Sequence, residues 1–334
     1  MSYDDGWAAL NLEMPKRIPR TEYSAPMHWD LITAVTGINV GISSSDELKQ
    51  KASLAFMQAW DFSFFWSTLV FYETLGEYQS EMGHAEYAAG GVDRQDTIYS
   101  LYDNPEDVLN FDPWEKLGIK DKEELTEQFE AHYQSNCVAH PDGVNMTGTY
   151  ITLVSGLIAL FGWEMLLLAA GTDRERFGEM ANRYASWMQQ YFDALAETDI
   201  PVVMVHDDIV WSSVPFIRPA WCREYVFPNY CKYFAPLLES GKKIMFCSDG
   251  NFNAFVDDIA GAGVHGFVFE PLTDLEPIVR KYGQTHVIVG NADTRVLLSG
   301  TREQIRAEVE RCMALGRDCP GFFMAVGNHI PSNT

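Results

Sequence analysis

Short apolar runs alternate with segments of helical periodicity along the C-terminal half of the chain. Five runs rich in Val, Ile, Phe and Met predict strands, at residues 201–208, 243–250, 266–271, 286–293 and 321–329. Helical segments are predicted between them, at 219–240, 252–261, 275–282 and 301–314. Because the runs are almost continuously apolar, the strands are expected to be covered on both faces, as in a parallel sheet flanked by helices.

The N-terminal half adds three weaker strand candidates, at 20–25, 61–67 and 144–150, and one or two long helices within 153–196. Eight strands alternating with helices predict a (β/α)₈ barrel that spans residues 1–334 as one domain. The acidic, turn-rich segment 73–141 is longer than an ordinary strand–helix loop and is expected to be an insertion near the barrel mouth. A complete barrel would have an eighth helix after the last strand, and the printed sequence stops before one.

Polar residues follow each of the five C-terminal strands. The clusters are His206-Asp207-Asp208, Cys247-Ser248-Asp249-Gly250-Asn251, Glu270-Pro271, Gly290-Asn291-Ala292-Asp293 and Gly327-Asn328-His329. A single cluster of this kind usually only makes a turn. Five of them, at strand ends that meet on one face of a barrel, predict a shared site at its C-terminal face.

Composition narrows the class of partner. The chain has 24 Lys and Arg against 47 Asp and Glu, a formal net charge of −23, which argues against nucleic acids and anionic membranes. Its longest apolar runs are interrupted by glycine and by Trp163-Glu164, so no bilayer-spanning segment is expected. Six scattered cysteines without a CxxC pair predict reduced thiols and a cytoplasmic protein. The oligomeric state has no marker in the sequence.

Four segments resemble the uroporphyrinogen decarboxylase superfamily: NLEMPKRIPRTEYS (11–24), CSDGN (247–251), GNADTRVLLSGTREQIRAEVERC (290–312) and GFFMAVGNHIPSNT (321–334). The resemblance implies a (β/α)₈ barrel and one of two chemistries. One branch removes carboxylates from a porphyrinogen without a cofactor. The other contains methyltransferases that exchange a methyl group with a corrinoid protein, usually with zinc as the Lewis acid.

The decarboxylase branch differs from this chain in two places. It binds its polycarboxylate substrate with an arginine-bearing segment after the first strand, whereas RTEYSAPMHWD has Glu22 and His28 there and no arginine after Arg20. It also has an aspartate after the second strand, where this chain has Phe65-Trp66-Ser67-Thr68. An acidic mouth would repel a substrate with many carboxylates, so the methyltransferase branch is the closer match.

The resemblance implies Cys247, Asp293 and His329 as zinc ligands. The better-known zinc methyltransferases have His-x-Cys after the fifth strand and Cys after the eighth, where this chain has Cys247-Ser248-Asp249 and Asn328-His329. In the O-demethylase group the motif is Glu, fourteen residues, Glu, twenty residues, His. Asp293, Glu308 and His329 reproduce those intervals with Asp in the first place. Glu308 falls within a predicted helix, and we expect it to be a solvated charge.

The expected activity is a methyltransferase that moves a methyl group from a small, O-methyl aromatic substrate to the cobalt of a separate corrinoid protein. Asp208 and Glu270 are the predicted catalytic residues. The predicted substrate-binding residues are Tyr23, Trp66, Tyr150, His206, Trp211, Asp249 and Asn291. Two alternatives remain open: a cofactor-free decarboxylase or lyase that acts on a small acid through Asp208 and His329, and a non-catalytic binding barrel.

Overall fold

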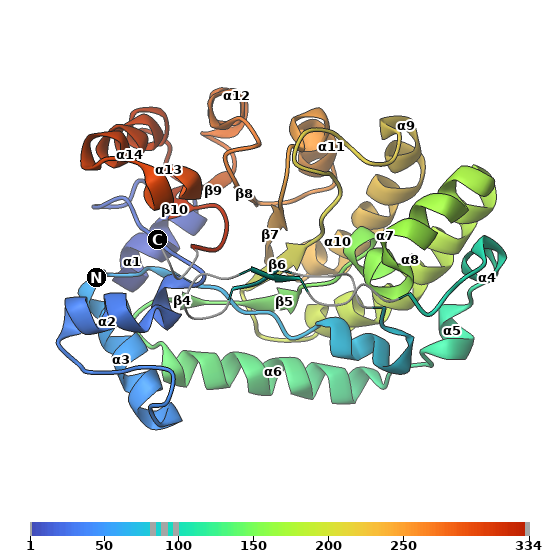
Figure 1. The fold of residues 1–334 in the computed structure, drawn as a ribbon, viewed down its shortest axis with the longest axis horizontal. Coiled ribbons are helices and arrows are strands. Elements are labelled where there is room, and N and C mark those ends of the chain that lie inside the picture. The colour runs from blue at the N-terminus through green and yellow to red at the C-terminus, as the bar shows by residue number, and fades with distance from the viewer. Residues whose placement is uncertain (1, 81–84, 88–92, 96–99, 331–334) are drawn as a thin grey trace.

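A computed structural model describes residues 2–80, 85–87, 93–95 and 100–330. Its main sheet is parallel and six-stranded, with the strands adjacent in the order β10–β9–β8–β7–β6–β5 (Figure 1). The strands are β5 (Thr147–Thr149), β6 (Val202–His206), β7 (Lys243–Ser248), β8 (Gly266–Phe269), β9 (Val287–Ala292) and β10 (Phe322–Val326). The five C-terminal strands therefore lie where the sequence pattern predicts them.

Shorter pairings continue the sheet toward a barrel. β1 (Phe64–Phe65) pairs in parallel with β4 (Val144–Asn145), which is followed by β5. Arg20 forms a parallel bridge with Met324 of β10, and its carbonyl accepts a hydrogen bond from the Ser63 amide. These bonds link β10 through Arg20 to β1, so eight chain segments follow one another around the fold, although regular strand pairing is interrupted on this side.

The first predicted strand, 20–25, is the weakest. Only Arg20 has a strand-type bridge, and the 3₁₀-helix η1 (Ala25–Met27) begins five residues later. Pro19 and Pro26 flank this segment and lack the N–H that a continuous ladder requires. The segment is thus held in the barrel by individual contacts such as the hydrogen bond from the Thr21 side chain to the Phe64 carbonyl.

Alternate residues of the strands point into the barrel and form an interior cluster, as the two-residue period of a strand requires. Apolar side chains from β1, β4 and β6–β10 meet there. Ala9 and Leu10 of the N-terminal helix α1 (Ser2–Leu10) belong to the same cluster. Cys247 of β7 belongs to it as well and also lines the pocket described below.

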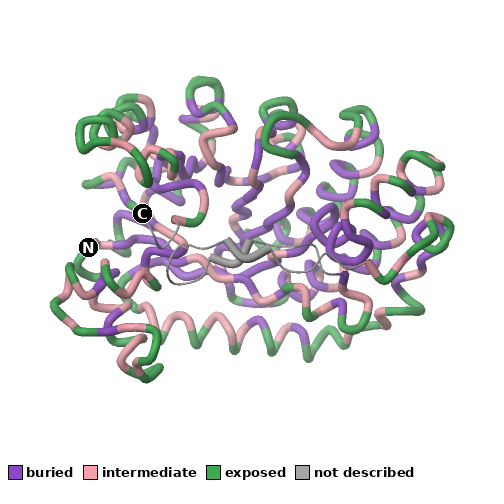
Figure 2. Tube along the Cα trace, in the orientation of Figure 1, coloured by how far each residue is buried: buried purple, intermediate pink, exposed green. Residues whose placement is uncertain are grey.

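The other face of the strands packs against helices, and the buried residues in Figure 2 follow the strands and the inward sides of these helices. The principal ones are α7 (Val154–Thr172), α8 (Arg174–Ala196), α10 (Phe227–Glu239), α11 (Val256–Gly261), α12 (Leu275–Tyr282) and α14 (Arg302–Gly316). α7 is long and apolar enough to cross a membrane, but most of it is buried and it packs on α4 (Pro105–Leu109) and α8, as core helices do.

The segment expected to be an insertion, 73–141, contains several elements within its described residues. These are most of η2 (Tyr72–Tyr78), the antiparallel pair β2 (Ala85–Tyr87) and β3 (Asp93–Gln95), α4, α5 (Pro113–Lys116) and α6 (Lys122–Ala139). α6 packs against α8, β4 and β5, and Figure 1 shows it on the opposite side of the molecule from α11, α12 and α14. It takes the position of the barrel helix between β1 and β4.

Shorter elements complete the described chain. Before β1 lie α2 (Trp29–Thr36) and α3 (Asp46–Ala59), which pack on each other. The connection from β6 to α10 contains α9 (Pro219–Trp221) and a π-helical turn, η3 (Cys222–Val226). A 3₁₀ turn, η4 (Asn253–Phe255), precedes α11, and α13 (Thr294–Ser299) precedes α14.

Candidate functional site

A pocket of about 430 Å³ opens at the carboxyl ends of the strands. Its walls come from the first chain segment, the residues after β1 and β5, and the ends of β6, β7 and β10. The lining residues are Tyr23, Trp66, Ser67, Thr68, Phe71, Tyr150, Met204, His206, Cys247, Asp249, Gly327, Asn328 and His329. The structure therefore brings together seven of the residues singled out in the sequence: Tyr23, Trp66, Tyr150, His206, Cys247, Asp249 and His329.

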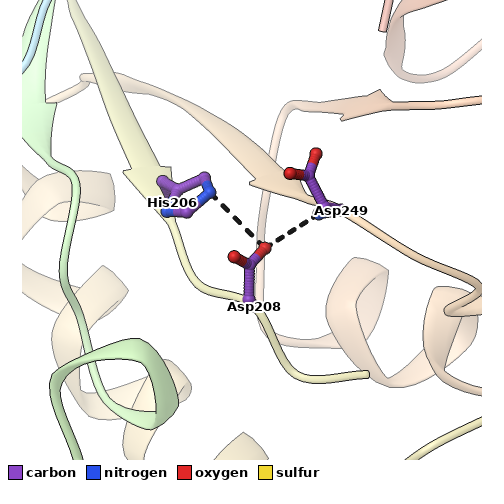
Figure 3. Close-up of side chains that lie close together, drawn as sticks. All are labelled: His206, Asp208 and Asp249. Atoms are coloured by element: carbon purple, nitrogen blue, oxygen red, sulfur yellow. Dashed lines mark hydrogen bonds and ion pairs between the residues drawn. The ribbon is translucent and has the colours of Figure 1, made fainter. Parts of the chain in front are cut away.

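Three ionisable side chains converge at the junction of β6 and β7. A ring nitrogen of His206 and carboxylate oxygens of Asp208 and Asp249 all lie within 4.8 Å of one another (Figure 3). His206 Nε2 is 3.4 Å from Asp208 Oδ1, and that oxygen also accepts a hydrogen bond from the Asp249 amide at 2.9 Å. β6 and β7 are adjacent and parallel, and His206 lies opposite Cys247 in their register. Asp208 and Asp249, each two residues further along, therefore emerge side by side.

The orientation of His206 is fixed by Tyr150. Its Nδ1 lies 2.7 Å from the Tyr150 carbonyl, and the two rings stack with centroids 4.3 Å apart and an interplanar angle of 5°. A carbonyl can only accept, so Nδ1 carries a proton and Nε2 faces the carboxylates. Burial by itself would lower the pKa of His206, but the negative charges of Asp208 and Asp249 outweigh it and raise that pKa.

The two carboxylates differ in their surroundings. Burial, followed by the charge of Asp208, raises the pKa of Asp249 to about 7, and a hydrogen bond with Asn328 partly opposes the rise. Asp208 is more open, with about a third of its side chain exposed, and its backbone amide donates a hydrogen bond to Ser155 Oγ. The site can therefore hold a proton near neutral pH.

Asp207 points away from this site, as strand alternation predicts for one of the two adjacent aspartates. It is fully buried and accepts hydrogen bonds from the amides of Leu153, Val154 and Ser155 at the start of α7. The hydroxyls of Ser155 and Tyr230 donate to it as well. Asp207 is a structural residue that anchors α7 to β6.

Cys247 and His329 also line the pocket, where both lie close to Tyr23. The Tyr23 hydroxyl is 3.5 Å from Cys247 Sγ, and the Tyr23 ring stacks on Trp66 at 4.7 Å and lies 5.8 Å from the His329 ring. Burial raises the pKa of the Cys247 thiol and lowers the pKa of His329, with nearby charges reinforcing both shifts. A neutral thiol and a neutral imidazole therefore flank the aromatic pair.

Glu270 and Trp211, like Asp208, lie next to the pocket without lining it. Glu270 Oε1 accepts a hydrogen bond from the Gly250 amide at 2.7 Å, so it holds the turn that carries Asp249. Gly250 has φ +78°, and a Cβ there would lie 2.5 Å from the Trp211 carbonyl, which explains the glycine. Trp211 is 47% exposed and packs with Trp163 and Phe216. Neither Glu270 nor Trp211 is among the pocket residues.

Asn291 and Asp293 are held by structural contacts. Asn291 is buried, and both ends of its side-chain amide are paired. Its Nδ2 donates to the Thr273 carbonyl, and its Oδ1 accepts from Arg311. Asp293 caps α13 and forms an ion pair with Arg295 at 2.7 Å, and this pair, with the accompanying hydrogen bonds, lowers its pKa. Neither residue lines the pocket or belongs to the group of three described side chains that could share an ion, and the roles expected for them stay predictions.

The surroundings of Glu308 differ from those expected from the sequence. It is not a solvated helix charge, because its side chain is only 12% exposed, and its Oε1 accepts a hydrogen bond from the Asp293 amide at 2.9 Å. The interval between the two residues therefore does reflect proximity in space. Both carboxylates are paired with arginines, Asp293 with Arg295 and Glu308 with Arg311, which accounts for the cluster without a metal.

Glu22 also departs from the expectation of an acidic mouth. It lies outside the pocket lining, and its Oε1 accepts a hydrogen bond from the Val326 amide of β10 at 2.8 Å. Its other oxygen, Oε2, is buried without a hydrogen-bond partner among the described residues. Burial raises the pKa of Glu22 to about 8, so it is mostly neutral at pH 7. The negative charge near the pocket comes from the β6 and β7 carboxylates instead.

Ser67, Thr68, Phe71 and Asn328 line the pocket although sequence reasoning assigned them no role. Ser67 and Thr68 follow the second strand, and that position alone could have marked them, because the ends of all barrel strands face the same side. Phe71 stacks on Tyr150 with centroids 4.9 Å apart. Its place in the wall depends on the path of the chain after β1, which has no local sequence signal.

Residues 110–334 match the family model described as uroporphyrinogen decarboxylase (URO-D). The chain belongs to this family. Among solved structures, it is similar to a methyltransferase from Methanosarcina mazei at 15% sequence identity, covering 99% of this chain and 95% of that one with a TM-score of 0.62. At that identity the likeness concerns the fold. An amidohydrolase matches at 10% identity over 96% of this chain and 67% of its own, with a TM-score of 0.36 that carries no argument. No curated protein sequence matches the chain.

The convergent triad has the donor chemistry of a divalent metal site. His206 offers Nε2 while Nδ1 is engaged by a backbone carbonyl, which is the usual arrangement of a ligating histidine. Zinc binds histidine nitrogen and carboxylate oxygen atoms, so two carboxylates and one imidazole form a donor set that it can accept. Among the described residues, this is the group of three acidic, cysteine or histidine side chains close enough to share an ion. Cys247 and His329 line the same pocket but do not belong to it.

Proposed function

We propose that this member of the URO-D family is a methyltransferase that removes the methyl group of a small methyl ether, with an aromatic ether as the preferred substrate class. The observation that carries the proposal is the convergence of His206, Asp208 and Asp249 beside a pocket walled by Tyr23, Trp66, Phe71 and Tyr150. Aromatic walls favour a flat, apolar substrate, and the polar triad provides one place for an oxygen atom. The fold similarity to a methyltransferase agrees with this class of reaction.

The reaction breaks the bond between the methyl carbon and the ether oxygen. The electron pair of that bond stays with the oxygen, which must gain a proton or a positive charge to leave at neutral pH. A proton held between His206 and Asp208, or on Asp249, is available at the site, since neighbouring charge and burial raise the pKa values of His206 and Asp249. The methyl group passes to the cobalt of a separate corrinoid protein, which supplies the electron pair of the new bond.

Zinc is the cofactor that suits this site, held by His206, Asp208 and Asp249. When bound there, it would supply Lewis acidity toward the ether oxygen. Cys247 and His329, the ligands implied by sequence resemblance, remain an alternative pair in the same pocket. With zinc held by Cys247 and His329, Asp208 would move the proton; with zinc held by the triad, Asp208 would act as a ligand and the charge on the leaving oxygen would be offset by that Lewis acidity. Glu270 acts on the turn that carries Asp249 and is better described as a positioning residue.

A cofactor-free decarboxylase or lyase is the second candidate, because a paired imidazole and carboxylate such as His206 and Asp208 can move a proton without a metal. The pocket argues against it. Among the described residues that line the pocket there is no arginine or lysine to bind a substrate carboxylate. A non-catalytic binding barrel would leave the raised pKa values of His206 and Asp249 without a use.

We place the reaction in the cytoplasm, where the six free cysteines would stay reduced. The corrinoid partner is expected to bind transiently. The chain has a net charge of −23, so an acidic partner would be repelled except where charges are locally matched. A complex that survives gel filtration at physiological salt would contradict a transient association.

The assay follows methyl transfer directly. The purified protein, loaded with zinc, is incubated anaerobically with methoxyphenols and with cob(I)alamin or an isolated corrinoid protein, and methylcobalamin and the demethylated phenol are quantified. We expect both products in equal amounts. Asp208→Asn should lower the rate about 10²- to 10⁴-fold, the range expected when a residue that moves or positions a proton is lost, while unfolding midpoints stay close to the parental value.

Two results would count against the proposal. A parental rate in Asp208→Asn would make Asp208 structural and transfer the catalytic role to Asp249 or His206. No methylated cobalt with any methyl ether, together with carbon dioxide release from a small acid, would replace the methyltransferase by the decarboxylase.

A further inference from the structure

Ser67 is a pocket residue with an unusual set of partners. It follows β1 and lines the pocket, and its hydroxyl lies 2.6 Å from Nε2 of His132, a residue of α6. The Asn136 side chain, one helical turn further along α6, donates a hydrogen bond from Nδ2 to the same oxygen at 2.9 Å. α6 therefore reaches the pocket through two polar side chains that both act on one serine.

These contacts leave the Ser67 hydroxyl one hydrogen-bonding position for a ligand. A serine hydroxyl has one proton and two acceptor positions, and its oxygen already accepts from Asn136. Partial burial lowers the pKa of His132, so its imidazole is neutral and carries a proton on one ring nitrogen only. If Nε2 accepts, Ser67 donates to it and keeps one acceptor position; if Nε2 carries the proton, Ser67 accepts from it and keeps its own proton. In either tautomer the two α6 side chains leave one position of the hydroxyl unused.

The walls of the pocket away from Ser67 have a different chemistry. The aromatic walls offer ring faces, and the acceptors of the triad lie with His206 at the β6–β7 junction. Ser67 lies after β1, a different wall of the pocket from the β6–β7 junction. A ligand that spans the pocket would therefore meet an acid cluster at one end and a neutral hydroxyl at the other.

We propose that Ser67, with its hydroxyl held by His132 and Asn136, is a specificity-determining residue that forms a hydrogen bond with a second polar group on the substrate. The proposal rests on the proposed function only for the identity of the ligand as a methyl ether. It narrows the substrate class to ethers that carry a second, hydrogen-bonding group, such as a free hydroxyl on the ring, which can both donate and accept. Ethers without that group would leave the remaining position of the Ser67 hydroxyl unpaired when the pocket is filled.

Binding measurements test this without any methyl transfer. Dissociation constants are measured by calorimetry for the three methoxyphenol isomers and for methoxybenzene, which lacks the hydroxyl, with the parental protein and with Ser67→Ala. We expect the best methoxyphenol to bind about 3- to 10-fold more tightly than methoxybenzene, the value of one net hydrogen bond. Ser67→Ala should remove this preference by weakening the methoxyphenol alone.

His132→Gln is the matched control. The Gln Oε1 and Nε2 atoms lie as many bonds from Cβ as His Nε2, so the amide can accept from Ser67 or donate to it, and the preference should survive in this variant. His132→Ala should weaken it, because the hydroxyl then loses its fixed direction. Thermal unfolding of each variant checks that the fold is kept.

Several outcomes would overturn the assignment. Equal affinity for methoxyphenols and methoxybenzene in the parental protein would do so, as would a preference unchanged in Ser67→Ala. No binding of any of the four compounds would overturn the aromatic ether class and this assignment together. A Ser67-dependent preference without methyl transfer to cobalt would instead uphold the assignment and contradict only the proposed reaction.

Discussion

At the scale of single residues, the chemistry of the site depends on which neighbour each ionisable group has. His206 and His329 both line the pocket, yet the pKa of His206 is raised by two carboxylates, whereas burial lowers the pKa of His329. Asp207 and Asp208 are adjacent in sequence, but only Asp208 reaches the site. Residue type therefore shows that acid–base groups are present, and their neighbours determine what each can do.

The two possible zinc ligand sets can be separated by substitution. If His206, Asp208 and Asp249 hold the ion, Asp249→Ala should lower zinc affinity at least about 10-fold, because each ligand of a three-residue site contributes strongly. Cys247→Ser should then change affinity little. Zinc content by elemental analysis after dialysis, with affinity from a competing chelator, provides the measurement. Loss of zinc in Cys247→Ser with full retention in Asp249→Ala would assign the ion to Cys247 and His329 instead.

At the scale of elements, the strand ends and the helix starts are tied together by buried polar contacts. The clearest case is the junction of β6 and α7, where Asp207 satisfies three of the backbone amides left unpaired at a helix start. Ser155 joins the two sides of this junction: its hydroxyl donates to Asp207 and accepts from the Asp208 amide. Asp208 is therefore positioned in the site through the same contacts that fix α7.

Asp207→Asn should destabilise the protein by about 2–4 kcal/mol, because the amide that replaces one carboxylate oxygen would face donors in a buried setting. Tyr230→Phe removes only the hydroxyl that donates to Asp207 and should cost about 1 kcal/mol. Urea unfolding followed by circular dichroism gives both values. Equal, small changes in the two variants would show that Asp207 does not hold the junction.

At the scale of the whole molecule, the barrel is completed between the first chain segment and β10 by few contacts. The first chain segment touches β10 through the Arg20–Met324 bridge and through Glu22, whose carboxylate accepts from the Val326 amide. The same segment carries Tyr23 into the pocket. The pocket lies toward this less regular side, and the ends of β8 and β9 do not line it. Glu270, Asn291 and Asp293 consequently bind other parts of the chain.

Glu22→Gln should reveal the cost of the buried carboxyl group through its pH dependence. The pKa of Glu22 is raised from 4.5 to about 8 in the folded state, so the unfolded chain loses the proton first as pH rises. Stability from this group is full below about pH 4.5 and declines as pH rises toward about 8. The variant should match the parental protein at pH 4.5 and exceed it by about 1–3 kcal/mol at pH 8.

Unfolding free energies measured at several pH values in the two proteins provide the test. Glutamine keeps an oxygen that can accept from the Val326 amide, so the comparison isolates ionisation from the loss of a hydrogen bond. A constant difference between the two proteins across this range would mean that Glu22 ionises in the folded state much as it does in the unfolded chain.

The sequence by itself determined the five C-terminal strands, because an apolar run of β-branched residues is most stable as a parallel strand covered on both faces. It also indicated the site's location, since polar residues after successive parallel strands must emerge on one face, and it supplied His206, Cys247, Asp249 and His329 as pocket residues. The family resemblance came from longer segments and agrees with the match over 110–334.

Only the tertiary structure decided which of those residues meet. The interval from Asp293 to Glu308 did bring the two together, but it could not show the arginines that pair with them. Ser67 becomes notable only because α6, some 65 residues later in the chain, presents His132 and Asn136 to it. Contacts between segments that are distant in sequence depend on the path of the whole chain, and short-range periodicity carries no record of that path.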